Sequence, residues 1–204
     1  MRSGVSSHEL LPIRLRWHGR GGQGVVTASR IIAEAALQAG LYLQSLPDFG
    51  AERSGAPIAA HTRIDLAPPV DRGPVTDPTM VIVLDPSLIG RLNVVAGLMP
   101  GGLVLINSRA GADDLALALQ LSLGRIVPID ASAIGERLLG RNLPNVPMVG
   151  ALASLLPFAP FRVVEEAARS VLSVSLRQHV VAANIEALKE GYAVVSTGTV
   201  ANHG

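Results

Sequence analysis

The chain has 204 residues and contains no cysteine. It therefore has no disulfide, no thiolate zinc site, no cysteine nucleophile and no ligand of its own for an iron–sulfur cluster. Charge is also scarce, because only 16% of the residues are charged and the formal net charge is +1. A chain with so little net charge has no strong field for a polyanion, so we do not expect nucleic acid as a partner.

Aromatic residues make up only 3% of a chain that is 49% hydrophobic, so its apolar content is mostly aliphatic. The mean hydropathy of +0.39 calls for a search for a membrane segment. Residues 142–161 form the longest uncharged stretch, but prolines interrupt it repeatedly, so we expect no membrane span. The N-terminus lacks the uninterrupted apolar stretch of a secretory signal, and we predict a cytoplasmic protein.

Short apolar runs alternate with stretches of helical periodicity along most of the chain. We predict strands at residues 13–17, 41–46, 59–64, 80–84, 103–106 and 125–129. We predict helices at residues 23–39, 87–96, 113–121, 131–139, 150–156, 163–173 and 175–190, with Gly40 and Gly191 ending two of them. This order predicts an α/β fold with a Rossmann-like, open, doubly wound and mostly parallel sheet, and a helical C-terminal portion.

The length suits one domain, and no internal repeat or low-complexity segment divides the chain. We expect residues 13–196 to form that domain, helical from about residue 150. Residues 1–12 and 197–204 are then a flexible N-terminal segment and a C-terminal tail.

A glycine-rich turn, Gly19 to Gly24, follows the first predicted strand and opens the first predicted helix. Its sequence GRGGQG satisfies the G-x-G-x-x-G pattern, in which glycines let the backbone approach a pyrophosphate at a helix N-terminus. Asp48, after the second predicted strand, is the acidic residue available to hold a ribose. The same glycines also allow close packing of a strand against a helix, so the pattern alone leaves both roles open.

A second cluster, residues 49–57 with the sequence FGAERSGAP, joins the second and third predicted strands. Glu52 and Arg53 lie there between glycines, which suggests a loop shaped for contact. The alternative is that these charges pair with each other or with neighbours on a solvated surface. Asp85 follows the apolar run MVIVL, where open α/β sheets place ligands and where an aspartate also caps the next helix.

The histidines have no metal-ligand spacing to one another, so we predict no metal site. His18 adjoins the glycine turn and is a candidate polar contact there. A structural role is the favoured interpretation for it, and no residue of this chain is predicted to be catalytic.

Several spaced motifs together resemble the gamma subunit or domain of the 2-oxoacid:acceptor oxidoreductases, of which pyruvate:ferredoxin oxidoreductase is the best-known member. The motifs are GRGGQGVVTAS, LPDFGAERSGAPIAAHTRI, VLDPSL, GGLVLINS and NVPMVGALAS, with a late N-x-x-A-x-x-x-G pattern at Asn184, Ala187 and Gly191. The resemblance extends from about Ile13 to the final helix. One departure is Ser54, where relatives commonly carry a second arginine.

The resemblance implies one subunit of a multi-subunit enzyme of anaerobic metabolism that oxidatively decarboxylates a 2-oxoacid to an acyl-coenzyme A. Thiamine diphosphate, Mg2+ and iron–sulfur clusters supply the chemistry in alpha, beta and delta-type subunits, and ferredoxin or NAD accepts the electrons. This chain has neither a cysteine nor a GDG motif followed by an Asn-Asn pair. We therefore expect it to hold none of these cofactors and to be inactive by itself.

The resemblance also implies that this subunit packs near the approach of coenzyme A to the active centre. The residues predicted at that interface are Arg20, Gly21, Gly22, Gln23, Gly24, Glu52 and Arg53. The two arginines would meet coenzyme A phosphates or a carboxylate of a partner. The alternatives are a small NAD(P)-binding dehydrogenase and a nucleotide-binding module, each using the G-x-G-x-x-G turn.

Overall fold

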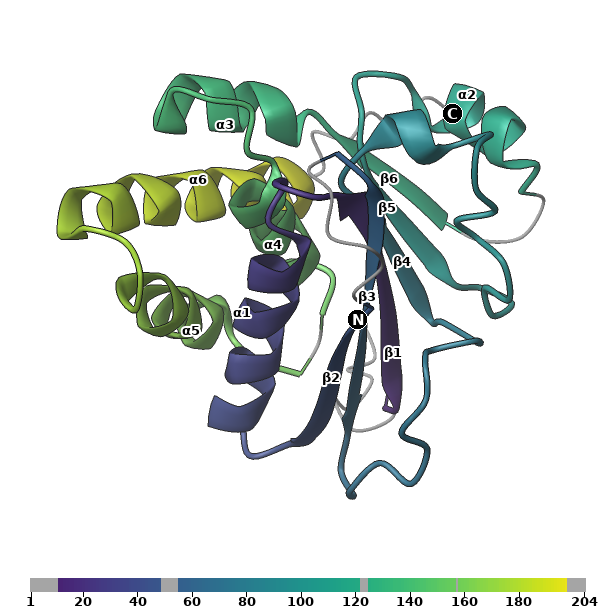
Figure 1. Ribbon diagram of the computed structural model, residues 1–204, viewed down its shortest axis with the longest axis horizontal. Helices are drawn as coiled ribbons and strands as arrows, with labels where there is room; N and C mark the ends of the chain where they lie inside the picture. Colours follow the sequence, from purple (N-terminus) through teal and green to yellow (C-terminus); the bar gives the residue numbers. More distant parts are fainter. Residues whose placement is uncertain (1–10, 49–54, 122–124, 157, 198–204) are drawn as a thin grey trace, which may run out of the picture.

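The computed structural model describes residues 11–48, 55–121, 125–156 and 158–197. A six-stranded sheet in the order β2-β3-β1-β4-β5-β6 forms its centre (Figure 1). The strands are β1 (Ile13–Arg20), β2 (Tyr42–Asp48), β3 (Pro57–Asp65), β4 (Met80–Val83), β5 (Leu103–Asn107) and β6 (Arg125–Ile129). β1, β4, β5 and β6 pair in parallel, whereas β3 runs antiparallel to both β1 and β2. The prediction of a mostly parallel sheet is confirmed.

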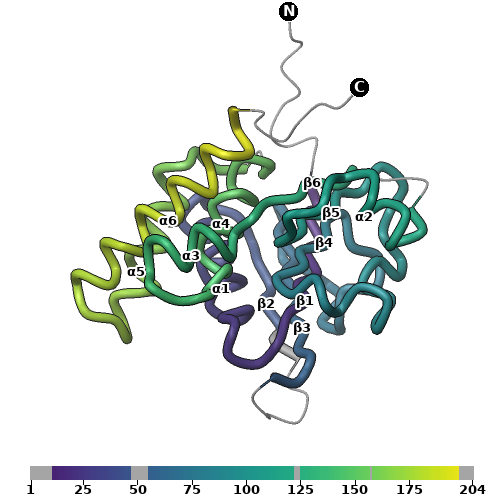
Figure 2. The backbone as a smooth tube through the Cα atoms, turned by 90° about the horizontal axis from the view of Figure 1, so that it is seen from above, coloured from purple at the N-terminus to yellow at the C-terminus, as the bar shows by residue number. Residues whose placement is uncertain are grey.

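One face of the sheet is covered by helices (Figure 1 and Figure 2). They are α1 (Val25–Gln38), α3 (Ala131–Leu139), α4 (Asn145–Ala153), α5 (Phe161–Ser173) and α6 (Gln178–Ser196). Beneath them lies the larger apolar core, to which β1 contributes Leu15 and Trp17. α4 is buried along its whole length, and this explains why the part of the uncharged stretch that it forms, Asn145–Ala153, has no charge.

The described elements run from Ile13 to Ser196. Within that part of the chain, no helix combines the length and the apolar character that crossing a bilayer requires. The division into one domain at residues 13–196 with loose ends on either side stays a prediction.

α4 and α6 pack at very short range through two glycines. A Cβ atom on Gly150 would lie 1.9 Å from the carbonyl oxygen of Leu188, and one on Gly191 would lie 2.0 Å from that of Pro147. The prediction that Gly191 ends the last helix is therefore wrong, because this glycine lies inside α6 at its contact with α4. α4 also begins before the predicted residue 150, since Pro147 occupies its first turn, where backbone N–H groups have no acceptor within the helix.

The other face of the sheet is covered by α2 (Ala112–Leu119) and by turns where a helix was predicted (Figure 1). Residues 87–96 form only the end of the short 3-10 helix η2 (Pro86–Leu88) and the turns after it, so the predicted helix is wrong. Arg16 donates to the carbonyl oxygens of Val94 and Ala96. Since a helix would use such carbonyls for its own ladder, the arginine stabilises turns instead. The expected double winding is correspondingly incomplete on this face.

Arginines of β1 and β3 also hold the segment that precedes β4 against the sheet. Arg14 donates from Nε to the carbonyl oxygen of Asp77 at 2.8 Å, and Arg63 donates to that of Pro74 at 3.0 Å. Arg14 and Arg63 lie opposite each other on paired strands, and Arg16 lies two residues farther along β1 on the same face, because residues of one parity along a strand share a face. Hydrogen bonds from charged donors to the backbone thus replace the packing that a second layer of helices would supply.

β6 forms one edge of the sheet. The N–H of Arg125 donates to the carbonyl oxygen of Gly102, and the carbonyl oxygen of Ile129 accepts from Ser108, both at 2.9 Å. Alternate residues of β6 therefore point their backbone polar groups toward β5, and Pro128 faces outward. An added strand would find no N–H at this position, because proline has none.

Candidate functional site

The glycine turn lies at the carboxyl end of β1, where the chain crosses to α1. The order of the strands reverses here, since β3 and β2 lie on one side of β1 and β4, β5 and β6 lie on the other. Open α/β sheets bind ligands at such a switch point. β1 extends through Arg20, farther than predicted, so residues 21–24 form the connection to α1.

A network of polar side chains joins the turn to the end of β4. Nε of Arg20 forms an ion pair with Oδ2 of Asp85 at 3.1 Å. Gln23 donates from Nε2 to the same oxygen at 2.8 Å, and its Oε1 accepts the N–H of Arg20 at 2.8 Å. Asp85 also accepts the N–H of Ser87 at 2.9 Å and so caps η2, which is one of the two roles considered for it.

The surroundings of Asp85 keep its carboxylate ionised. Burial alone would raise the pKa of this group, but hydrogen bonds from Ser87 and Gln23 and the charge of Arg20 outweigh burial. The pKa of Asp85 is consequently lower than its ordinary value. The switch point therefore holds a balanced ion pair.

Backbone donors of the glycine turn are used within the chain. The N–H of Gly21 donates to the carbonyl oxygen of Ala56 at 2.9 Å, and that of Gln23 donates back to the end of β1 at 3.1 Å. Gly19 lies so close to α1 that a Cβ atom would come within 2.5 Å of the Val25 side chain. With these two N–H groups occupied, fewer donors of the turn remain for a pyrophosphate, and this favours the packing role over the NAD(P)-binding alternative.

Asn145 of α4 packs on the end of the turn and was missed by the sequence analysis. Its side chain is buried, and Nδ2 lies 3.5 Å from the carbonyl oxygen of Gly24. Gly24 has a φ of +76°, and a Cβ atom there would meet Nδ2 of Asn145 at 2.3 Å. The motif NVPMVGALAS was the only signal for this contact, because the two residues are 121 positions apart. The contact fixes α1 and α4 to the glycine turn.

The second predicted cluster meets the turn at its C-terminal end. Gly55 donates its N–H to the carbonyl oxygen of Gly21 at 3.3 Å, and Nη1 of Arg20 donates to the carbonyl oxygen of Gly55 at 3.0 Å. Glu52 and Arg53 lie outside the described residues. The structure thus joins the other predicted residues, 20–24, to the start of β3, and their place at an interface stays a prediction.

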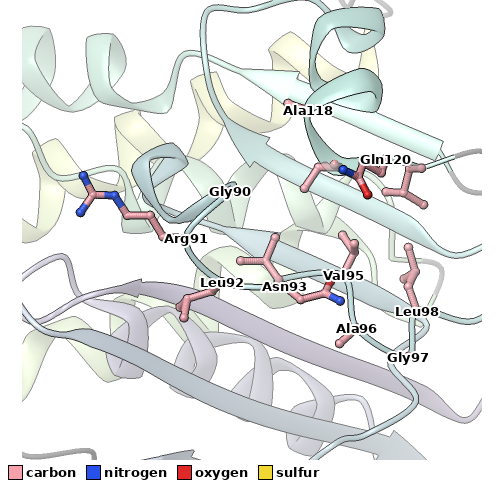
Figure 3. Close-up of a pocket in the computed structure, with 13 residues that line it drawn as sticks. Gly90, Arg91, Leu92, Asn93, Val95, Ala96, Gly97, Leu98, Ala118 and Gln120 are labelled. Atoms are coloured by element: carbon pink, nitrogen blue, oxygen red, sulfur yellow. The ribbon is translucent and has the colours of Figure 1, made fainter.

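A polar crevice of about 350 Å³ opens beside Gln23 and Asp85, over the ends of β4 and β5. Its polar groups are engaged with one another, as where Arg109 pairs with Asp130 at 2.6 Å. A larger hollow of about 640 Å³ lies between residues 90–98 and the end of α2 (Figure 3). Of the predicted interface residues that the structure describes, residues 20–24, none lines this larger hollow.

The donor groups of this chain do not suit the cofactors that the resemblance implies. No cysteine is present to hold an iron–sulfur cluster. Across the residues that the structure describes, no three histidine, aspartate or glutamate side chains are grouped so as to hold a metal ion. The polar network at the switch point joins the end of β1 to the segments before β3 and after β4.

His18 precedes the glycine turn and contacts Arg16. Nε of Arg16 lies 3.2 Å from Nε2 of His18, which accepts the hydrogen bond. Burial, followed by the positive charges of Arg16 and His61, lowers the pKa of His18 from 6.5 to about 4. The imidazole is therefore neutral at pH 7 and has a structural role as an acceptor.

We expect His18 to make folding stability sensitive to acid. The unfolded chain binds a proton at this residue near its ordinary pKa of 6.5, whereas the folded chain does so only near pH 4. Stability should therefore fall as the pH drops from 6.5 toward 4, by an amount on the order of 2 kcal/mol from this residue. Denaturant titrations across this range measure the slope. A His18→Gln variant keeps an acceptor for Arg16 and should have a flatter profile, so an unchanged slope would contradict the assignment.

The comparisons with known proteins agree with one another. The family model described as pyruvate ferredoxin/flavodoxin oxidoreductase matches residues 14–194. The common gamma subunit of the pyruvate/ketoisovalerate oxidoreductases of Thermococcus kodakarensis is 38% identical over 180 residues, or 88% of this chain and 95% of that protein. The crystal structure of pyruvate oxidoreductase subunit PORC from Thermotoga maritima superposes with a TM-score of 0.77 at 36% identity, covering 89% of this chain and 95% of that one.

A third similarity concerns the fold alone. The 2-oxoglutarate:ferredoxin oxidoreductase of Magnetococcus marinus has a chain that is 20% identical, with a TM-score of 0.74. The match covers 94% of this chain but 32% of that much longer chain. The same α/β architecture thus occurs there as one part of a larger polypeptide.

Proposed function

The chain belongs to the pyruvate ferredoxin/flavodoxin oxidoreductase family, and from this premise we propose that it is the gamma subunit of a complex that oxidises a 2-oxoacid and passes the electrons to ferredoxin. The observation that carries the proposal is the match of nearly the whole chain to nearly the whole of known gamma subunits. The family resemblance inferred from the motifs is confirmed by the same match.

We propose that partner subunits of alpha, beta and delta type hold thiamine diphosphate, Mg2+ and the iron–sulfur clusters. When bound there, these groups supply the decarboxylation and the electron transfer. This chain offers no thiolate for a cluster. Its contribution is a surface against which the partners pack, close to the approach of coenzyme A.

The proposed surface consists of the glycine turn, the start of β3 and the start of η2. These three segments are tied together by Arg20, which contacts Gly55, Asp85 and Ser87. Gly22 and Gly55 are exposed there, and their lack of side chains would let a partner approach closely. The charge of Arg20 is already paired within the chain, which supports subunit packing over a free anion site.

Copurification tests the proposal. An affinity-tagged copy expressed with its native partners should isolate larger subunits that show the visible absorption of iron–sulfur clusters and reduce ferredoxin when a 2-oxoacid and coenzyme A are added. The chain by itself should be colourless and inactive. A chain that remains alone in its native cells and recovers no partner would rule out the proposed role.

A titration with NADH separates the gamma-subunit role from the dehydrogenase alternative. Because the N–H groups of Arg20, Gly21 and Gln23 are used within the chain, we expect no change in NADH fluorescence at micromolar concentrations of the isolated protein. Saturable micromolar binding would instead favour a small dehydrogenase. A dehydrogenase known to bind NADH serves as the positive control.

A further inference from the structure

Three connections of the fold meet at the side chain of Arg20. Nη1 donates to the carbonyl oxygen of Gly55 at the start of β3, at 3.0 Å. Nη2 donates to Oγ of Ser87 in η2 at 2.9 Å, and Nε pairs with Oδ2 of Asp85 at 3.1 Å. One planar guanidinium at the end of β1 therefore binds the segments that follow β2 and β4, and only a side chain with several fixed donors does this.

The pairing with Asp85 distinguishes Arg20 from an arginine that awaits an anion. The side chain of Asp85 is only 13% exposed, and that of Arg20 is 25% exposed. A phosphate that drew Arg20 away would leave this largely buried carboxylate without its counter-charge, which is unfavourable. The geometry therefore keeps Arg20 in its present position.

Gln23 reinforces the same position. Its side chain accepts the backbone N–H of Arg20 and donates to Oδ2 of Asp85, both at 2.8 Å. The backbone of Arg20, the amide of Gln23, the carboxylate of Asp85 and the guanidinium of Arg20 thus form a closed ring of interactions. Such a ring orients both charged groups more strictly than the ion pair alone.

The β1–β3 ladder ends with Arg20 opposite Pro57, and few interactions besides Arg20 hold residues 55–56, just before β3, against the turn. The backbone contributes the 2.9 Å bond from Gly21 to Ala56 and the long 3.3 Å bond from Gly55 to Gly21. Gly55 has a φ of +85° and no atom near the position of a Cβ, so no side-chain packing holds it. The contact from Arg20 is accordingly the one charged hydrogen bond on this residue in the described part of the chain.

We propose that Arg20, anchored by Asp85 and Gln23, is a positioning residue that fixes the start of β3 against the glycine turn and so sets the shape of the docking surface. This inference rests on the proposed function for its consequence in the complex. It differs from direct contact with coenzyme A, because Arg20 then acts through the backbone of Gly55 and Asp85 is as important as Arg20 itself.

Hydrogen exchange on the full chain and on the purified complex tests the positioning directly. Arg20→Gln and Asp85→Asn should each increase exchange about tenfold in peptides that cover residues 55–57, because each removes a charge-assisted bond. The double variant should exchange no faster than either single variant. Ser87→Ala removes one acceptor without leaving a buried charge, and a smaller rise of about twofold is expected even if the charged variants fold poorly. Arg30→Gln, an exposed arginine of α1, serves as the matched control and should change nothing.

Steady-state kinetics of the complex separate positioning from direct ligand contact. Under the proposal, Arg20→Gln and Asp85→Asn raise the KM for coenzyme A or the dissociation constant of the subunit by the same factor. Arg20→Lys should raise the same value as Arg20→Gln does, since a lysine cannot bridge Gly55 and Ser87 together. If Asp85→Asn leaves both exchange and kinetics unchanged while Arg20→Gln raises the KM, Arg20 contacts the ligand itself and the proposal is wrong. Unchanged exchange in both charged variants also overturns it, whatever complex the chain joins.

Discussion

A Gly150→Ala or a Gly191→Ala variant is expected to lose about 3 kcal/mol or more of folding free energy. The added Cβ atom would lie 1.9 Å from a backbone oxygen of α6 in the first case and 2.0 Å from one of α4 in the second. No rotamer change relieves a clash with backbone, so the two helices would have to move apart. α4 is buried on every side, and such a movement would disturb the whole helical layer.

Thermal and denaturant unfolding of the two variants measure this effect. Gly111→Ala is a matched control, since no atom lies within 4 Å of the position of its Cβ and its φ is −67°. We expect that variant to remain within about 1 kcal/mol of the parent chain. Equal losses in the control and in the α4 and α6 variants would show that the close helix contact is not the cause.

Replacing Arg16 with methionine is expected to destabilise the chain by about 3 kcal/mol. The guanidinium is buried beneath the turns that follow β4, and it donates to the carbonyl oxygens of Val75, Val94 and Ala96. Burial lowers the pKa of this arginine, so its presence there has a desolvation cost that the carbonyls offset. Methionine fills much of the space but leaves these oxygens without a donor.

The measurements for Arg16→Met are the melting temperature, which should fall by about 10 °C, and the rate of proteolysis within residues 86–102. Arg14→Met on the same face of β1 is the control. Arg14 binds an aspartate whose side chain is 52% exposed, so we expect a loss of no more than about 1 kcal/mol. Comparable losses for Arg14 and Arg16 would contradict the special role of the buried arginine.

The positions of strands and of most helices were predictable because they follow from local patterns of apolar residues. β5 and β6 lie at the apolar runs LVLI and RIVPI, and α3 has the predicted bounds. Hydrophobic periodicity depends on residues that are close together in the sequence, so it can be recognised without the structure.

The failures concern interactions between distant parts of the chain. Residues 87–96 have helical periodicity, but Arg16 takes the carbonyls of Val94 and Ala96, and Gly90 and Gly97 adopt positive φ. Glycine is common just after the end of a helix, yet Gly191 lies inside α6, where its lack of a side chain leaves room for α4. In both cases a partner far away in sequence decides the outcome, and no local pattern identifies it.

The residues of the glycine turn were predictable from the sequence, but their contacts with distant residues were not. The GRGGQG motif correctly marked the junction of β1 and α1. Its partner Asp85 follows β4 and lies 62 residues from Gln23, and its partner Asn145 begins α4 and lies 121 residues from Gly24. Only the folded structure shows that Gln23 and Arg20 bind the carboxylate of Asp85 and that Asn145 contacts Gly24.

The outward-facing Pro128 of β6 has a consequence for a copy of this subunit that has been synthesised ahead of its companions. Such a copy exposes the edge strand β6, and exposed edge strands promote aggregation by pairing with strands of other molecules. The missing donor at Pro128, the fourth of the five residues of β6, interrupts that recruitment. In a free subunit, Pro128 therefore hinders aggregation through the β6 edge of the sheet.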